Sequence, residues 1–179
     1  MRYVRIPQER VGVVIGPNGS TKEQLERMTG VQTRIDSEQG EVLIDDRDVK
    51  DPLMPLKVED IVRAIARGFS PDHAFKLLNE DFFLHVFDIH DYVGKDREDV
   101  RRVAARVIGS EGKTRRIIEE LAGVLVSVYG HTVSIIADLE AMETGKKALD
   151  MILSGSEHAA LYRFLEGARR RSKLASREW

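Results

Sequence analysis

The sequence contains no cysteine, which excludes disulfide bonds and any metal site built on thiolates. A chain of this kind suits a reducing intracellular compartment. No apolar run is long enough to cross a bilayer, and the N-terminal residues lack the apolar core of a signal peptide. We therefore expect a cytoplasmic protein with no membrane partner.

The chain also lacks an excess of positive charge, since its formal net charge is −2. Proteins that bind duplexes without regard to sequence are usually basic, because neutralising phosphates supplies their affinity. A module that holds a short single strand in one groove needs only local positive charge. The composition disfavours the first class and leaves the second open.

Catalytic signatures are missing as well. The chain has no cysteine nucleophile, no Gly-x-Ser-x-Gly and no His-Glu-x-x-His, so we predict that it is not an enzyme and uses no cofactor. The acidic loop at residues 45–51 lacks the glycine and the terminal glutamate of a calcium-binding EF-hand. Histidines in or beside a strand are more often hydrogen-bonded structure than ligands. We accordingly expect no metal at the four possible ligands near residues 82–91, which are His85, Asp88, His90 and Asp91.

What the chain does contain is one short pattern used twice. Residues 14–21 read VIGPNGST, and residues 107–114 read VIGSEGKT. Each is the apolar end of a helical pattern that runs into Gly-x-x-Gly and then into a charged amphipathic helix. Two glycines allow a tight turn to bring bare backbone against a ligand, and the N–H groups that open the next helix favour an anion. Such a corner suits a sugar-phosphate backbone.

The similarity of the two copies extends beyond the glycines. When the copies are aligned on them, Glu26 matches Glu119 and Gly30 matches Gly123. A strand pattern precedes each copy, and a hairpin and a further helix follow, so the sequence predicts a duplicated β-α-α-β-β-α unit. Residues 82–87 form the most hydrophobic strand, which we expect to be central or covered on both faces.

This arrangement resembles two KH domains of type I, which carry Ile-Gly-x-x-Gly between their first two helices. The resemblance implies an α+β fold with two three-stranded antiparallel sheets, each covered by helices on one face. The linker is not flexible in composition, so we expect the two domains to be rigidly packed together. The last helix carries a basic tail, Arg169 to Arg171 with Lys173 and Arg177, of a kind that is usually disordered and that could attract RNA regardless of sequence. The expected division is 1–68 for the first KH domain, 69–80 for a short helical connector, 81–155 for the second KH domain, and 156–179 for a C-terminal helix and basic tail.

More narrowly, residues 60–70 and the loop at residues 109–114 resemble the archaeal version of the Partner of Nob One family, KH proteins that assist maturation of the small ribosomal subunit. That resemblance implies single-stranded RNA as the ligand, specifically the 3′ region of small-subunit ribosomal RNA. It also implies two protein partners, the endonuclease that trims this RNA and the alpha subunit of archaeal initiation factor two.

In KH domains the loop holds the RNA backbone while an aliphatic floor reads the bases. The floor candidates are Val14, Ile15 and Val31 in the first domain, and Val107, Ile108 and Val124 in the second. Because more basic residues flank the second loop and Pro17 stiffens the first, we predict that the second domain contributes more affinity. Glu111 is unusual for a KH loop and should repel phosphate. The full set of predicted RNA-binding residues is Val14, Ile15, Gly16, Pro17, Asn18, Gly19, Lys22, Arg34, Arg102, Arg106, Ile108, Gly109, Ser110, Glu111, Gly112, Lys113, Arg115 and Arg116.

Two other functions remain to be weighed. Residues 112–114 look like the end of a nucleotide-binding P-loop, but that motif needs a glycine where Val107 stands and a strand before the loop. The other alternative is a protein–protein scaffold whose KH folds no longer bind RNA, as Glu111 and the acidic total charge would suggest.

Overall fold

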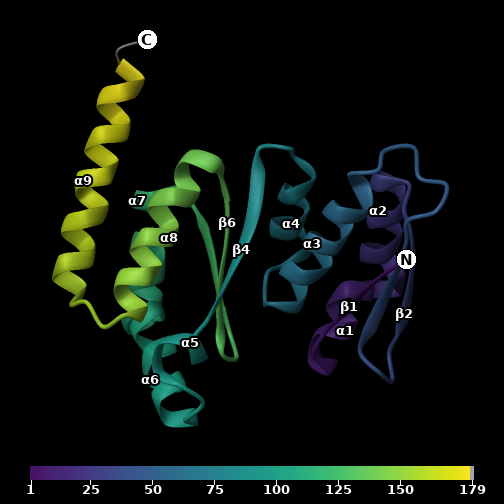
Figure 1. Cartoon of the computed structure of the whole chain (residues 1–179), viewed down its shortest axis with the longest axis horizontal. Coiled ribbons are helices and arrows are strands. Elements are labelled where there is room, and N and C mark those ends of the chain that lie inside the picture. The colour runs from purple at the N-terminus through teal and green to yellow at the C-terminus, as the bar shows by residue number, and fades with distance from the viewer. Residues whose placement is uncertain (178–179) are drawn as a thin grey trace. The chain divides into compact units, whose positions relative to one another are not determined.

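A three-stranded antiparallel sheet forms the centre of each half of the chain in the computed structural model, which describes residues 1–177 (Figure 1). The chain divides into two compact units, Met1–Glu80 and the residues from Asp81 onward. The first unit contains β1 (Arg2–Arg5), α1 (Gln8–Ile15), the 3-10 turn η1 (Pro17–Gly19), α2 (Ser20–Thr29), β2 (Gln32–Asp36), β3 (Glu41–Asp45), α3 (Met54–Ala66), α4 (Pro71–Ala74) and the 3-10 turn η2 (Phe75–Leu78). The second unit contains β4 (Phe82–Asp88), α5 (His90–Val93), α6 (Arg97–Ile108), the 3-10 turn η3 (Ser110–Gly112), α7 (Lys113–Ala122), β5 (Leu125–Tyr129), β6 (Thr132–Asp138), α8 (Leu139–Leu153) and α9 (His158–Arg177).

The first sheet has the strand order β1-β3-β2, and its two faces differ in burial. Side chains alternate between the faces of a strand. Val42 and Ile44 of the central strand β3 are completely buried under the helices, whereas Tyr3 of β1 is 61% exposed on the other face. This is the expected three-stranded sheet with helices on one face.

The second sheet has the order β4-β6-β5, with β6 rather than β4 in the centre. Residues Thr132 to Ala137 of β6 are all buried, while β4 is mostly half-buried and Phe83 is 46% exposed. The prediction that β4 is central or covered on both faces is therefore wrong, because β6 is the central strand and Phe83 of β4 remains exposed. β4 is apolar, as the sequence shows, but hydrophobicity alone does not determine the order of strands in a sheet. Among the described residues, β4 pairs with β6 alone and so lies at the edge.

The connector after the first KH pattern folds onto the first unit. Ser70 caps α4 by accepting a hydrogen bond from the backbone N–H of His73, and Pro71 takes the first helical position, as the sequence predicts. The Nζ of Lys57 in α3 donates to the carbonyl oxygens of Leu77 and Asn79, which ties the end of the connector to α3. Within residues 1–177, no helix combines the length and the apolar character that a membrane span requires.

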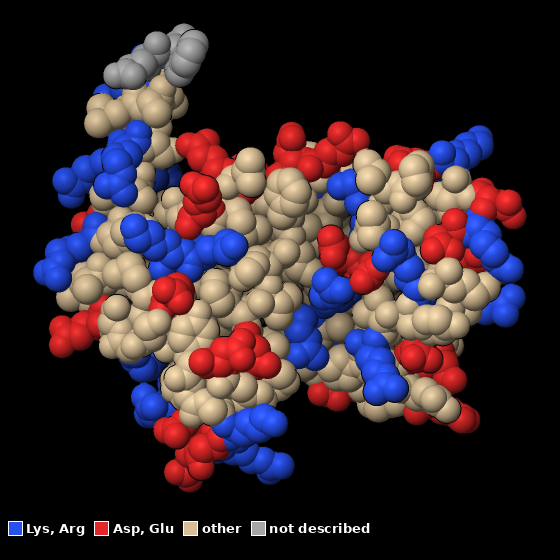
Figure 2. Space-filling model, viewed as in Figure 1, with Lys and Arg blue, Asp and Glu red and all other residues tan. Residues whose placement is uncertain are grey.

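The last helix, α9, lies against α7 and α8 (Figure 1). Leu161 and Leu165 are fully buried there, and the guanidinium of Arg169 donates to the carbonyl oxygen of Glu120 at 2.7 Å. The helix continues to Arg177, so the expectation of a disordered tail is wrong over the described residues. A helix docked through its first half provides a hydrogen-bonded template on which the basic residues add further turns. Figure 2 shows Lys and Arg side chains gathered along this helix.

Candidate nucleic-acid interface

The two Gly-x-x-Gly loops have the same backbone conformation. Gly16 and Gly109 have φ/ψ of 77°/170° and 74°/174°, and Gly19 and Gly112 have 77°/9° and 75°/15°. The residue before the second glycine is left-handed in both loops, with φ of 53° at Asn18 and 54° at Glu111. Each loop joins two helices through one 3-10 turn. The sequence repeat is therefore also a repeat of backbone geometry.

The first glycine of each loop is required by packing. A Cβ at Gly16 would lie 2.6 Å from the backbone nitrogen of Thr21, and one at Gly109 would lie 2.7 Å from that of Thr114. Either Cβ would also overlap the Oγ1 of the same threonine, whose side chain is buried beneath the loop. The conformation itself lies in a region that only glycine adopts readily.

The second glycine of each loop is open. Among the described residues, nothing lies within 4 Å of a Cβ built at Gly19 or Gly112. This glycine immediately precedes the first residue of α2 or α7, and neither helix is capped by a side chain of the described chain. The N–H of the first residue of each helix, Ser20 or Lys113, donates within the turn to the carbonyl oxygen of Pro17 or Ser110. An anion that approaches over the second glycine would therefore meet the positive end of the helix dipole.

A matched glutamate secures each loop's second helix to the edge of its sheet. Glu26 Oε1 accepts from the backbone N–H of Thr33 at 2.7 Å, and Glu119 Oε1 accepts from that of Val126 at 3.0 Å. Partial burial acts to raise the pKa of Glu26, but hydrogen bonds from Thr33 and Lys22 outweigh it and lower the pKa below its ordinary value. Glu119 is thus occupied by the sheet edge, rather than by the arginines near the second loop.

The basic residues predicted around the first loop are mostly committed elsewhere. Lys22 forms an ion pair with Glu26 at 2.9 Å. Arg34 is exposed on β2, paired across the sheet with Leu43, and alternates with the buried Thr33. It therefore lies on the face of the sheet opposite α1 and α2, and the prediction that it flanks the loop is not supported by this placement. Pro17 and Asn18 are exposed in the loop itself.

The second loop borders a hollow of about 500 Å³ that the sequence did not reveal. Two of its lining residues, His158 and Tyr162, come from α9 and are held there by polar contacts. The hydroxyl groups of Tyr162 and Thr114 lie 3.1 Å apart, and His158 Nε2 lies 3.0 Å from the carbonyl oxygen of Arg106. No local signal could have placed them here, since they are distant along the chain. The hollow is lined by Arg102, Ala105, Arg106, Gly109, Ser110, Lys113, Thr114, His158 and Tyr162.

The predicted cations of the second domain differ in how free they are. Arg106 is half-buried and donates to the carbonyl oxygens of Ile152 and Ser156, so its guanidinium ties α6 to the end of α8 and the segment after it. Arg102 pairs with Asp99 at 3.3 Å and remains exposed. No ion pair of Arg115 or Arg116 occurs among residues 1–177, and both are exposed on α7. Glu111 is exposed at the tip of the loop.

Most of the predicted aliphatic floor is core instead. Val14 is 2% exposed, and Val31 and Val107 are completely buried, so these side chains do not face a ligand. They point inward because each occupies the core-facing position of its own helix or strand. Val124, at 3% exposure, belongs to the core of the second unit together with Val107. Of the six floor candidates, Ile108 is 38% exposed and Ile15 is half-buried, and these two border the loops.

A second hollow, of about 510 Å³, lies between α6 and the β5–β6 turn. Arg97, Arg101, Ala104 and Ile108 recur at helical spacing along one stripe of α6, which leads from this hollow to Gly109. That spacing is readable in the sequence, although the Gly-x-x-Gly motif does not include it. The hollow is lined by His90, Lys95, Arg97, Val100, Arg101, Ala104, Gly130 and His131.

The surroundings of the second loop differ from those of a P-loop. The loop follows the helix α6, whereas a P-loop follows a strand. Val107, which stands where that motif needs its first glycine, is a fully buried core residue. The geometry is that of a corner between two helices beside a basic stripe, which can hold a polyanionic strand without metal or general base.

Comparisons with known proteins match both halves of the chain. Residues 83–170 match a family described as a eukaryotic-type KH domain of KH-domain type I, named for the second domain of Pno1, and residues 1–50 match the KH domain family. The first of these matches includes most of α9.

Whole-chain relatives extend these matches. The chain is 47% identical over 176 residues to a KH domain-containing protein of Methanocaldococcus jannaschii, covering 98% of this chain and 77% of that one. It is 27% identical over 175 residues to the pre-rRNA-processing protein pno1 of Schizosaccharomyces pombe, covering 97% and 73%. A solved complex of a/eIF2alpha, aDim2p and rRNA from Pyrococcus horikoshii contains a similar chain, with a TM-score of 0.88 at 44% identity and coverage of 95% and 94%.

Proposed function

Since the chain belongs to the Pno1/Dim2 family of tandem KH-domain proteins, we propose that it binds single-stranded RNA during maturation of the small ribosomal subunit. The observation that carries this proposal is the pair of loops with matching backbone geometry, each with an open second glycine at an uncapped helix start. The processing role is proposed because the Schizosaccharomyces pombe relative is a pre-rRNA-processing protein.

The proposed ligand is the 3′ region of small-subunit rRNA. In support, the similar Pyrococcus horikoshii chain was solved together with rRNA and a/eIF2alpha. The alpha subunit of initiation factor two is accordingly a proposed partner of this chain. The endonuclease that trims the RNA is a further proposed partner, on the strength of the family's role as a partner of Nob1.

The mechanism we propose for the second domain uses three parts. A phosphate lies over Gly112 at the positive end of the α7 dipole, while the side chain of Lys113 adds positive charge beside it. The bases lie along the α6 stripe, with the exposed Ile108 next to the loop and Ala104 farther along. Arg97 and Arg101 attract the strand beyond it. None of these steps forms or breaks a covalent bond, so the proposed role is non-enzymatic, and its place is the cytoplasm, where ribosomal subunits are assembled.

The proposal is tested by Gly19→Asp and Gly112→Asp, separately and together. Both sites are open and left-handed, a conformation that aspartate tolerates, so the fold should persist. The new carboxylate would sit where phosphate binds, and we expect affinity for a single-stranded oligomer of the rRNA 3′ region to fall about tenfold or more for Gly112→Asp. Because Lys113, Arg115 and Arg116 surround only the second loop, Gly19→Asp should cost less. Fluorescence anisotropy measures the affinities and circular dichroism checks the fold.

The alternative is a scaffold whose KH folds no longer bind RNA. It would leave the wild-type chain without affinity for single strands, or leave affinity unchanged in the folded double variant. Either result would refute the proposal. Matched controls are Gly12→Asp in α1, which is exposed and outside the loop, and Gly155→Asp after α8.

A further inference from the structure

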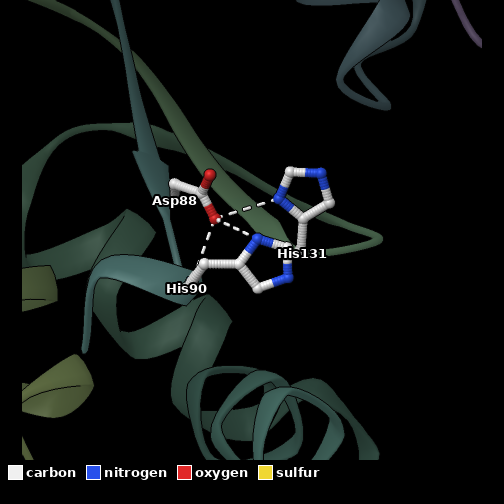
Figure 3. A group of neighbouring side chains, drawn as sticks. All are labelled: Asp88, His90 and His131. Carbon is white, nitrogen blue, oxygen red and sulfur yellow. Dashed lines mark hydrogen bonds and ion pairs between the residues drawn. The ribbon is translucent and has the colours of Figure 1, made fainter. Parts of the chain in front are cut away.

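Two histidines and one aspartate meet at the end of β4, and the histidines border the hollow that Arg97 and Arg101 also line. His131 Nδ1 lies 3.0 Å and His90 Nδ1 lies 3.3 Å from the same oxygen, Oδ1 of Asp88 (Figure 3). The two imidazole rings are stacked, with centroids 4.3 Å apart and planes 9° apart. One ligand-type atom from each of the three residues lies within 4.8 Å of the other two. From the sequence we expected no metal at Asp88 and His90, and the proposal departs from that expectation because the structure adds His131, from the β5–β6 turn, to the same group.

Backbone pairing holds these groups in place. Asp88 is the last residue of β4 and pairs with Thr132 of β6, and the N–H of Ile89 donates to the carbonyl oxygen of His131 at 2.8 Å. The backbone N–H of His90 donates to Oδ1 of Asp88 at 2.9 Å. All three residues therefore start from positions fixed by the sheet and its turn, which reduces the ordering that a bound ion would require.

The distances suit ligands of one ion. Zinc–nitrogen and zinc–oxygen bonds are about 2.0–2.2 Å long, so neighbouring ligand atoms on one tetrahedral ion lie roughly 3.3–3.6 Å apart. The separation from His90 Nδ1, 3.3 Å, reaches that interval, and the separation from His131 Nδ1, 3.0 Å, is shorter by a few tenths of an ångström, which a small side-chain movement would supply. Binding of one ion by both imidazoles requires one ring to leave the stack. His131 is the more exposed of the two, since its side chain is 46% exposed and that of His90 is 28% exposed.

From this cluster we infer a binding site for a single divalent transition-metal ion of the zinc type, with Asp88, His90 and His131 as its protein ligands. Two imidazoles and one carboxylate match the donor preference of Zn²⁺ and related ions, and leave at least one position for water. Lys95, Arg97 and Arg101 line the hollow that His90 and His131 also border, and their charge disfavours any cation held by charge alone. The positive charge nearby therefore disfavours Mg²⁺ and Ca²⁺, which bind mainly to oxygen ligands, more than ions that bond strongly to imidazole.

Asp88 is the natural anionic member of the set. An aspartate carboxylate is ordinarily ionised at neutral pH, so Asp88 offers its charge to an ion. The neighbouring His85, by contrast, lies edge-on against Phe87 at 4.6 Å and takes no part in the cluster.

The test is isothermal titration of the tag-free, chelator-treated full chain with ZnCl₂ in a phosphate-free buffer at pH 7.5. We expect saturable binding of one Zn²⁺ per chain, no comparable heat with MgCl₂, and a loss of roughly tenfold or more in affinity for His90→Ala and His131→Ala. Matched controls are His73→Ala and His85→Ala, which remove histidines outside the cluster and should bind as the wild type does. Asp88→Asn provides a variant of nearly unchanged shape in case an alanine variant misfolds.

Long-range ¹H–¹⁵N spectra give a second readout, because Zn²⁺ should shift the Nδ1 signals of His90 and His131 and leave His85 unshifted. Absence of saturable binding would overturn the inference. So would binding that survives His131→Ala and Asp88→Asn, or that weakens equally in His85→Ala. None of these measurements involves RNA, so the outcome is independent of the proposed function.

Discussion

At the scale of single residues, the two glycines of each loop have different roles. Gly16 and Gly109 keep the buried threonine beneath the loop in place, because a Cβ there would collide with its backbone nitrogen. Gly19 and Gly112 leave the outer side of the corner open to a ligand. A Gly-x-x-Gly motif thus combines one packing requirement with one binding requirement, and substitutions can separate them.

We predict that Gly109→Ala destabilises the second domain. Its φ/ψ of 74°/174° is strained for alanine by about 1–3 kcal/mol, and the overlap with Thr114 adds to that cost. Gly112→Ala is the matched control, since the site is open and a left-handed alanine costs roughly 1–2 kcal/mol. Urea denaturation followed by second-domain NMR signals measures both. Equal stability of the two variants would contradict this separation of roles.

We predict that Glu111→Asn improves both stability and RNA binding. Glu111 is left-handed with φ of 54°, a conformation that asparagine adopts more readily, and Asn18 occupies the same position in the first loop. The change also removes a carboxylate from the loop tip, where it repels phosphate. Denaturation midpoints and anisotropy titrations measure the two effects. As a control for charge alone, Glu120→Gln removes an exposed carboxylate of α7, and an equal gain in affinity there would contradict a specific effect of the loop.

At the scale of elements, α6 and α9 shape the second site more than the loop motif indicates. One stripe of α6 leads from Arg97 to Ile108 at the loop, and α9 adds His158 and Tyr162 to the hollow beside Gly109. The same α9 continues as a helix past Arg169, whose guanidinium is held by the carbonyl oxygen of Glu120. The exposed cations beyond it therefore project from a fixed helix and not from a loose tail.

We predict that these cations add sequence-independent attraction for RNA. Replacing Arg170, Arg171 and Lys173 with glutamine should weaken binding and flatten the salt dependence, by about 0.7 in the slope of log K against log salt for each phosphate that is no longer neutralised. Affinities measured across a series of salt concentrations determine the slope. The control replaces Arg5, Lys50 and Lys76, three exposed cations of the first unit, with the same change in net charge. An unchanged slope in the α9 variant, or equal changes in both, would exclude this helix from the interface.

At the scale of the whole molecule, the chain repeats one fold with unequal additions. Both units contain the sheet, the corner and the matched glutamate, but only the second has a long helix after its last KH element. The basic residues left exposed near a loop are also concentrated in the second unit. This difference agrees with the prediction that the second KH domain contributes more affinity for RNA.

We predict that the two units move as one body in solution. The connector is short, contains the capped helix α4, and is tied to α3 through Lys57, so it offers little flexible chain. ¹⁵N relaxation of the full chain should give the same rotational correlation time for both units. As a positive control for independent motion, a variant with a Gly/Ser linker inserted after Glu80 should give two shorter times. Two distinct times in the wild-type chain would contradict the prediction.

Much of this structure follows from interactions between residues close together in the sequence and could therefore be predicted from it. The glycines that adopt positive φ, the serine and proline that start α4, and the apolar spacing of α1, α2 and α6 act over a few residues, so their patterns survive in the sequence. The order of elements in both KH units was predicted correctly for that reason. The alternation of β2 could also have placed Arg34 on the outer face, had the period of two been applied to it.

Other features depend on contacts between residues far apart in the sequence. A local sequence pattern does not indicate which distant residue such a residue will contact. Hydrophobicity marked β4 as a strand but could not tell that β6 would take the centre of the sheet. Docking on α7 and α8 turned an expected tail into a helix and carried Tyr162 to Thr114. Strand pairing likewise brought His131 to Asp88 and His90. Such contacts form because folding buries whole faces of helices and sheets against one another. They can therefore be identified only from the packed structure.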